Sequence, residues 1–188
     1  MSESIRRVLD PDQWVTKYAD ILFRYVYLRV TDAAIAEDIV QETFLSGWRS
    51  RETYDQSSSE KNWLFTICKN KIIDHFRKSN SNRIIQIGEY SDNFYFDEND
   101  HWTNEAKPAL WKISILPCDN EDFVKVLNRC RSKLNKTQLA VFTMRYMDEM
   151  DAHEICRSMD ITVKNYWVLI HRAKIQLREC LQRNWIDV

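Results

Sequence analysis

The sequence predicts an all-α protein made of two small helical domains joined by an acidic linker. Apolar residues recur at helical spacing toward both ends of the chain. The 188 residues include only two glycines and three prolines, which are the residues that most often interrupt helices. Between the periodic parts, residues 83–122 carry nine acidic and three basic residues and keep no period for long. We therefore assign residues 1–82 to a first domain and residues 123–188 to a second, basic one.

Composition limits the class of protein. With 44% hydrophobic and 29% charged residues, the chain is typical of a soluble globular protein. No stretch approaches the length of a membrane span, and the N-terminus lacks the apolar core of a signal peptide, so we expect a cytoplasmic protein. The cysteines are odd in number and form no C-x-x-C pair, so we expect reduced thiols packed in cores rather than disulfides or a zinc site. They are Cys68, Cys118, Cys130, Cys156 and Cys180.

The first predicted helix begins near Asp10, a candidate N-cap, with Pro11 at the first helical position. Its apolar stripe comprises Trp14, Tyr18, Ile21, Leu22 and Tyr25. Thr31 or Asp32 can cap a second helix. There Ala36, Ile39, Val40 and Thr43 are expected to face inward, and Glu37, Asp38, Gln41, Glu42 and Leu45 to border the outer side. A helix face of this polar kind is usually only a solvated surface.

Three consecutive serines, residues 57–59, end a polar loop and open a third predicted helix. One face of this helix should carry Leu64, Cys68, Ile72 and Phe76, and the opposite face Trp63, Thr66, Asn70, Asp74 and Arg77. Trp63 has two interpretations, because a lone tryptophan is more often part of a core than of a binding surface.

The acidic linker is unusually aromatic. Its rings are those of Tyr90, Phe94, Tyr95, Phe96, Trp102 and Trp111. Such side chains usually bury surface somewhere, so we expect the linker to dock on some other surface.

The last third of the chain has the pattern of a helix-turn-helix. Asp151 and Glu154 have the spacing of a capping box, and a turn of about three residues ends at Thr162, a good N-cap for a second helix. The first helix has one apolar face, formed by Ala152, Ile155, Cys156 and Met159. In the second, Val163, Tyr166, Ile170, Ala173 and Leu177 should face the core, and Lys164, Asn165, Val168, His171 and Arg172 should point away from it.

Residues 36–45 and 63–78, read as Ala-Glu-Asp-Ile-Val-Gln-Glu-Thr-Phe-Leu and Trp-Leu-Phe-Thr-Ile-Cys-Lys-Asn-Lys-Ile-Ile-Asp-His-Phe-Arg-Lys, resemble the second conserved region of bacterial sigma factors. Residues 134–142, the helix-turn-helix and residues 171–178 resemble the fourth region. The order and length are similar to the extracytoplasmic-function (ECF) group of the sigma-70 family, which keeps only these two regions and a linker.

The resemblance implies a non-catalytic function without cofactors. Family members bind core RNA polymerase and direct promoter recognition, melting and transcription initiation, the second region opening the minus-ten element and the fourth reading the minus-thirty-five element. Implied partners are the polymerase β and β′ subunits, promoter DNA and an anti-sigma factor. Melting also needs an aromatic pocket and hydrogen bonds to a flipped base. The implied DNA-binding residues are Lys61, Asn62, Trp63, Asn70, Arg77, Lys78, Thr162, Lys164, Asn165, Val168, His171, Arg172 and Lys174, with the last two as phosphate contacts.

The resemblance also assigns Asp38, Gln41, Glu42 and Leu45 to the clamp helices of the β′ subunit, and the acidic linker to the channels that later hold RNA. The recognition helix departs from the common pattern at Asp160 and at residues 167–169. There Trp167 and Leu169 either contact DNA or pack in the core, and Val168 is suited to a thymine methyl group.

Other function classes have less support. His153 and Glu154 begin like a zinc-protease motif, but the second histidine is missing, and no glycine-rich phosphate loop exists. The main alternative is a helix-turn-helix regulator that binds duplex DNA without polymerase. A module that only binds another protein is the third. The combined motifs of the N-terminal domain favour the sigma factor over both.

Overall fold

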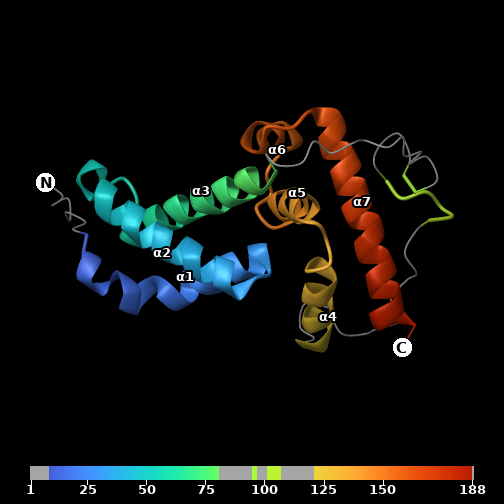
Figure 1. The fold of residues 1–188 in the computed structure, drawn as a ribbon, viewed down its shortest axis with the longest axis horizontal. Coiled ribbons are helices and arrows are strands. Elements are labelled where there is room, and N and C mark those ends of the chain that lie inside the picture. Colours follow the sequence, from blue (N-terminus) through green and yellow to red (C-terminus); the bar gives the residue numbers. More distant parts are fainter. Residues whose placement is uncertain (1–8, 81–94, 97–100, 107–120, 188) are drawn as a thin grey trace, which may run out of the picture. The chain divides into compact units, whose positions relative to one another are not determined.

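The computed structural model describes residues 9–80, 95–96, 101–106 and 121–187 (Figure 1). In these residues the secondary structure is helical apart from one isolated antiparallel bridge between Phe96 and Trp102. The predicted all-α class is therefore confirmed. The chain divides into two compact units, residues 1–75 and 76–188, and the division falls within the third long helix.

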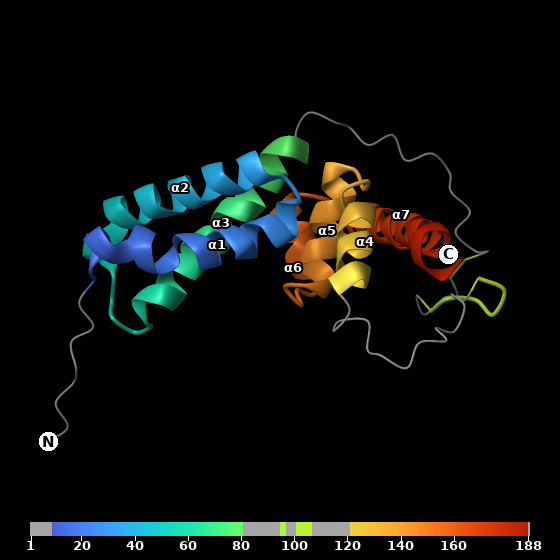
Figure 2. The same cartoon turned by 90° about the horizontal axis from the view of Figure 1, so that it is seen from below.

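The first unit is a bundle of three helices that lie side by side (Figure 2). A 3-10 turn, Pro11–Gln13, leads into α1 (Trp14–Val30), which is followed by α2 (Ala33–Ser50), a second 3-10 turn (Arg51–Thr53) and α3 (Glu60–Asn80). Thr31 ends α1 in the left-handed conformation, and the Asp32 carboxylate accepts a hydrogen bond from the Ile35 N–H (3.1 Å). Asp32 is thus the N-cap of α2.

Most inward positions of this unit follow the predicted faces. The side chains predicted to face inward from α2 and from α3 up to residue 75 are all buried: Ala36, Ile39, Val40, Thr43, Leu64, Cys68 and Ile72. Phe76, directly after the boundary between the two units, is buried as predicted too. In α1, Trp14 and Leu22 are buried, but Ile21 is 37% exposed, so its predicted place in the core stripe is wrong. Ile21 directly precedes Leu22, and neighbouring helical residues project about 100° apart.

Gly47 lets α2 approach the core closely. A Cβ atom at this position would lie 3.0 Å from the Trp14 ring and 3.1 Å from Leu64 Cδ2. Both neighbours are fully enclosed, with exposed fractions of 2% and 0%. The helix therefore packs here through its backbone.

The second unit contains α4 (Glu121–Arg131), α5 (Lys136–Tyr146), α6 (Ala152–Met159), α7 (Val163–Leu181) and a terminal π-helical turn (Gln182–Ile186). Asn135 and Gln138 form a complete capping box at the start of α5. α7 packs against α4, α5 and α6, so it organises the unit. One core cluster comprises Cys130, Leu134, Leu139, Ala173, Leu177 and Cys180.

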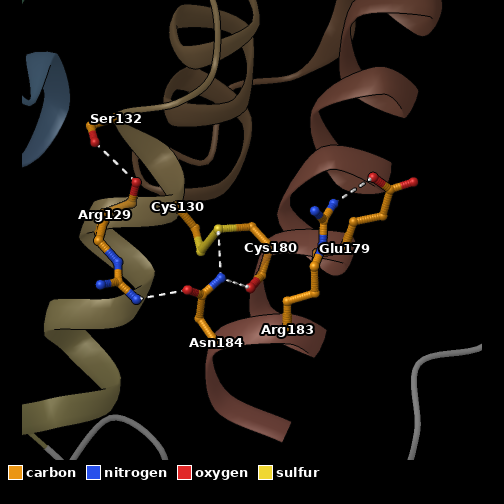
Figure 3. The surroundings of a disulfide bond; sticks show 7 residues. All are labelled: Arg129, Cys130, Ser132, Glu179, Cys180, Arg183 and Asn184. Atoms are coloured by element: carbon orange, nitrogen blue, oxygen red, sulfur yellow. Dashed lines mark hydrogen bonds and ion pairs between the residues drawn. A yellow bond between two sulfur atoms is a disulfide. The ribbon is translucent and has the colours of Figure 1, made fainter. Parts of the chain in front are cut away.

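A disulfide within this cluster corrects the expectation of reduced thiols. Cys130 of α4 and Cys180 of α7 are bonded, with Cα atoms 5.7 Å apart (Figure 3). Beside the bond, the Asn184 amide donates to the Cys180 carbonyl (2.6 Å) and accepts from the Arg129 guanidinium (2.8 Å). The pair is 50 residues apart in sequence, so no local spacing indicates it. Cys68 and Cys156 are free and buried as expected, and Cys118 lies outside the described residues.

Candidate nucleic-acid and polymerase interfaces

The helix-turn-helix forms at the predicted residues. The Asp151 carboxylate accepts from the Glu154 N–H (2.8 Å), which begins α6 and lowers the pKa of Asp151 from its usual value. Asp160 ends α6 in the left-handed conformation, with φ of 53°, and the Thr162 hydroxyl accepts from the Asn165 N–H (3.2 Å) to begin α7. Asn and Asp tolerate this conformation better than most residues, so Asp160 fits this turn.

Most candidate side chains of α7 lie away from the core. Thr162 and Lys164 are exposed, and the other predicted contacts, Asn165, Val168, His171, Arg172 and Lys174, are partly exposed. The core face is Tyr166, Ile170, Ala173 and Leu177, as predicted. Val163 is a correction, because it is 43% exposed at the first position of the helix, beyond the packed part. Of the two undecided residues, Leu169 is core (2% exposed) and Trp167 lies at the surface (38% exposed).

α3 presents a second set of candidates. Asn62, Asn70, Arg77 and Lys78 are exposed. Trp63 is half-buried, with its ring 6.0 Å from that of Trp14 and 5.3 Å from that of Tyr54. It therefore combines both interpretations: one side packs on neighbouring rings and the other remains accessible.

Spacing places three of the α3 candidates on one stripe, and Lys61, Asn62 and Lys78 beside or away from it. Trp63, Asn70 and Arg77 are seven residues apart, which is about two turns, so they share a face. Lys61 lies about 200° around the helix from Trp63, and its ammonium is 5.9 Å from the centre of the Phe65 ring. Phe65 in turn packs edge-on against Tyr25 of α1 (5.1 Å). Lys61 is thus exposed but on a different side from the stripe.

The predicted polymerase-binding residues form one exposed face of α2. Asp38, Gln41, Glu42 and Leu45 are all exposed, and Leu45 is 56% exposed. Glu42 pairs with Lys71 of α3 (3.2 Å), an exposed contact that contributes little stability. Trp48, which was not predicted as part of this face, is 49% exposed one turn beyond Leu45 and extends it. Trp48 follows Leu45 by three residues, and this helical spacing could have indicated that the two side chains share a face.

The buried Cys68 thiol has a structural role. Burial raises the pKa of the Cys68 thiol to about 11, which leaves it protonated and unreactive near neutral pH. Within the described ranges, no three His, Cys, Asp or Glu side chains are grouped to hold a metal ion. Nor does any described helix have the length and apolar character needed to cross a membrane.

A helix-turn-helix with an outward polar face, joined to a separate helical bundle, is typical of a DNA-binding protein. Comparison with known proteins assigns the family. The model of Sigma-70 region 2 matches residues 14–82, and that of Sigma-70, region 4 matches residues 125–177. The chain belongs to the RNA polymerase sigma factors, in the ECF group of the sigma-70 family.

Individual relatives extend over most of the chain. A probable RNA polymerase sigma factor of Haemophilus influenzae is 32% identical over 166 residues, covering 86% of this chain and 84% of that protein. The ECF RNA polymerase sigma factor SigM of Bacillus subtilis is 24% identical and covers 94% of this chain and 98% of its own length. Among solved structures, the sigma factor RpoE in complex with the anti-sigma factor NepR from Bartonella quintana aligns with a TM-score of 0.47 and 18% identity, covering 92% of this chain and 97% of that one.

Proposed function

We propose that this chain is an ECF-type sigma factor that binds core RNA polymerase and directs promoter recognition, melting and transcription initiation. The observation that carries the proposal is the match of both sigma regions, in order, to two separately packed helical units. The chain has no catalytic role in this proposal. It supplies specificity to an enzyme whose active site lies in another subunit.

The C-terminal unit reads duplex DNA in this proposal. Lys164, Asn165 and Val168 project from the first turns of α7, the part of a recognition helix that meets base edges in the major groove. The amide of Asn165 can pair with adenine, and the methyl groups of Val168 with thymine. Arg172 and Lys174 lie further along the helix and contact phosphates, which set affinity and register. Thr162 both caps α7 and presents its exposed side chain at the same end.

The N-terminal unit opens the duplex and holds the polymerase. The stripe of Trp63, Asn70 and Arg77 offers a ring for stacking, an amide for a base edge and a cation for a phosphate. Asn62 and Lys78 add polar contacts beside the stripe, and Lys61 adds positive charge on another side of α3. The α2 face of Asp38, Gln41, Glu42 and Leu45 binds the β′ clamp helices. We assign these functions to residues 1–82, minus-thirty-five recognition to residues 123–188, and passage through the polymerase to the linker 83–122. An anti-sigma factor is the expected inhibitory partner.

The α2 assignment can be tested by charge reversal. The double variant Asp38→Lys/Glu42→Lys should lose binding to core polymerase in a fluorescence or gel-filtration assay, while its helical circular dichroism is retained. The matched control is Asp12→Lys/Asp20→Lys, which makes the same change of charge at exposed positions of the same unit outside α2. Equal loss in both variants would mean that net charge matters and the α2 face does not.

The alternative function, a regulator that binds duplex without polymerase, makes the opposite prediction. Such a protein would bind its operator tightly by itself and would not stimulate core polymerase. The family membership favours the sigma factor.

A further inference from the structure

One side chain of α7 is buried although it faces away from the core cluster of the second unit. Ile175 is 8% exposed. It lies two residues from both Ala173 and Leu177, which belong to the core cluster, so it projects from nearly the opposite side of the helix. Something other than the helical core must therefore cover this side.

A segment of the linker lies there. Phe96 and Trp102 form the antiparallel bridge, and the Thr103 N–H donates to the Tyr95 carbonyl (3.0 Å). The Phe96 ring stacks on the His171 imidazole with centroids 4.2 Å apart and planes 18° apart, and it contacts the tilted Trp102 ring at 4.5 Å. Phe96 is only 4% exposed. We call residues 95–96 and 101–106 the aromatic clamp.

Cations of α7 complete the contact. Lys174 Nζ lies 4.9 Å from the centre of the Phe96 ring, and the Arg178 guanidinium carbon lies 5.8 Å from that of Trp102. Both distances are within the range of cation–π attraction. His171, Lys174 and Arg178 are the i−4, i−1 and i+3 neighbours of Ile175, so the clamp extends over the part of α7 where Ile175 is buried.

The same surface is needed for DNA. His171 and Lys174 belong to the proposed duplex contacts, and Lys164 and Val168 continue their stripe toward the start of α7. An α-helix with side chains is about 10–12 Å across, and the major groove is about 12 Å wide. The helix alone fills the groove, so α7 carrying a layer of aromatic rings on its outer side cannot enter it to full depth.

We propose that the aromatic clamp masks the outer face of α7 in the free chain, so that duplex DNA and the linker compete for the same residues. The inference rests on the proposed function, in which α7 is the duplex reader. Its consequence is that the free protein binds promoter duplex weakly, and that whatever displaces the aromatic clamp unmasks the C-terminal unit.

Release of the clamp should strengthen DNA binding by the full-length chain. A clamp closed nine-tenths of the time weakens the apparent affinity about tenfold, because only the open fraction binds. Phe96→Ala and Trp102→Ala should each lower the Kd for a promoter duplex toward this limit in a fluorescence anisotropy titration at fixed salt. Tyr27→Ala is the control, since Tyr27 is an exposed aromatic residue of the first unit, 41% exposed, and its Kd should match that of the wild type.

A structural readout shows whether the clamp is closed. Stacking on Phe96 should shift the His171 ring protons upfield in the NMR spectrum, assigned with His171→Gln. This shift should disappear in Phe96→Ala and when saturating duplex is added to the wild type. Circular dichroism identifies any variant that fails to fold, and the duplex titration of the wild type tests the competition without any substitution.

Three results would overturn the proposal: no upfield shift in the wild type, persistence of the shift with bound duplex, or loss of the shift in folded Phe96→Ala with an unchanged Kd. Runoff transcription with core polymerase separates this failure from failure of the proposed function. If the wild type directs transcription but any of the three results is found, only the proposal that the aromatic clamp masks α7 is wrong. If it directs none, the sigma-factor function itself is wrong.

Discussion

Glu60 is the residue that ties the start of α3 to the start of α1. Its Oε1 accepts from the Asp10 N–H and the Trp14 indole N–H, both at 2.6 Å, and its Oε2 accepts from the Tyr18 hydroxyl (3.0 Å). Burial, followed by this hydrogen bond and the charge of Glu60, raises the pKa of Tyr18. One carboxylate thus satisfies three donors at the edge of the core.

Removal of this carboxylate should destabilise the first unit. Glu60→Ala leaves the Trp14 indole N–H unpaired in a packed site, which costs about 1–3 kcal/mol in the free energy of unfolding. Glu60→Gln keeps an acceptor oxygen and should cost less. Urea denaturation followed by circular dichroism measures both. Equal stability of Glu60→Ala and the wild type would show that water replaces the carboxylate.

The same contact predicts a dependence on alkaline pH. Because the pKa of Tyr18 is raised in the folded state, its contribution to stability is fully present below 10.0, the ordinary value, and is lost as the pH rises through the folded value. In Glu60→Gln the pKa of Tyr18 should fall back toward 10.0. Titration of the Tyr18 ring carbon by NMR, assigned with Tyr18→Phe, measures this shift. A pKa that is unchanged in Glu60→Gln would limit the cause to burial.

Gly47→Ala sets helix propensity against packing. Alanine favours a helix interior over glycine by about 1 kcal/mol, whereas overpacking a core costs about 1–3 kcal/mol. Trp14 and Leu64 are enclosed and cannot move aside freely, so we expect a net loss of about 1 kcal/mol in the free energy of unfolding. The neighbouring change Ser46→Ala, at a partly exposed position, is the control and should have an effect within about 0.5 kcal/mol. Stabilisation by Gly47→Ala would contradict the tight contact.

At the scale of elements, the disulfide joins the two ends of the C-terminal unit. It links α4 to the last turn of α7 across 50 residues. Closing a loop of this length restricts the unfolded chain and is worth about 3–4 kcal/mol in the chain-entropy description. Adding a thiol reductant should therefore lower the melting temperature of the second unit. The variant Cys130→Ser/Cys180→Ser should already melt lower and should not respond to reductant. A wild type that melts equally with and without reductant would contradict the bond.

The two helices that we propose to contact DNA, α3 and α7, should show different defects when their exposed residues are replaced. Asn70→Ala on α3 should permit a closed polymerase complex but reduce opening, and a pre-melted bubble template should restore part of the activity. Arg172→Ala on α7 should weaken the initial complex by about 1 kcal/mol or more and should gain nothing from the bubble. Footprinting and abortive transcription on both templates measure the two steps. If both variants show one defect, unrelieved by the bubble, the division of function between α3 and α7 is wrong.

At the scale of the whole molecule, the features that the sequence predicts well are those set by short-range periodicity. The inward and outward faces of α2 and the cap at Thr162 depend on residues three or four positions apart, and these predictions are confirmed. For α2 the sequence offered Thr31 or Asp32 as the cap, and the structure selects Asp32. The prediction that Val163 faces the core was wrong. Helical periodicity extends the apolar face to the end of a helix, even where no other part of the protein packs against that end.

Features that depend on distant residues were only partly accessible. Nothing local indicates that Cys130 and Cys180 meet, and general statistics of cysteine spacing pointed the other way. The aromatic residues of the linker predicted that it docks on another surface, and Phe96 and Trp102 do contact α7. The sequence did not identify α7 as the surface that they contact. The placement of the DNA and polymerase contacts on exposed faces agrees with the pattern, and their roles stay predictions.

The central claim is that this chain gives promoter specificity to RNA polymerase, and runoff transcription tests it most directly. Core polymerase is combined with the purified chain and a promoter library, and the transcripts are sequenced. We expect defined start sites that depend on both components, and their loss with Asp38→Lys/Glu42→Lys but not with Asp12→Lys/Asp20→Lys. Transcription unchanged by adding the chain, together with tight sequence-specific binding of duplex by the chain alone, would contradict the account and favour a regulator that acts without polymerase.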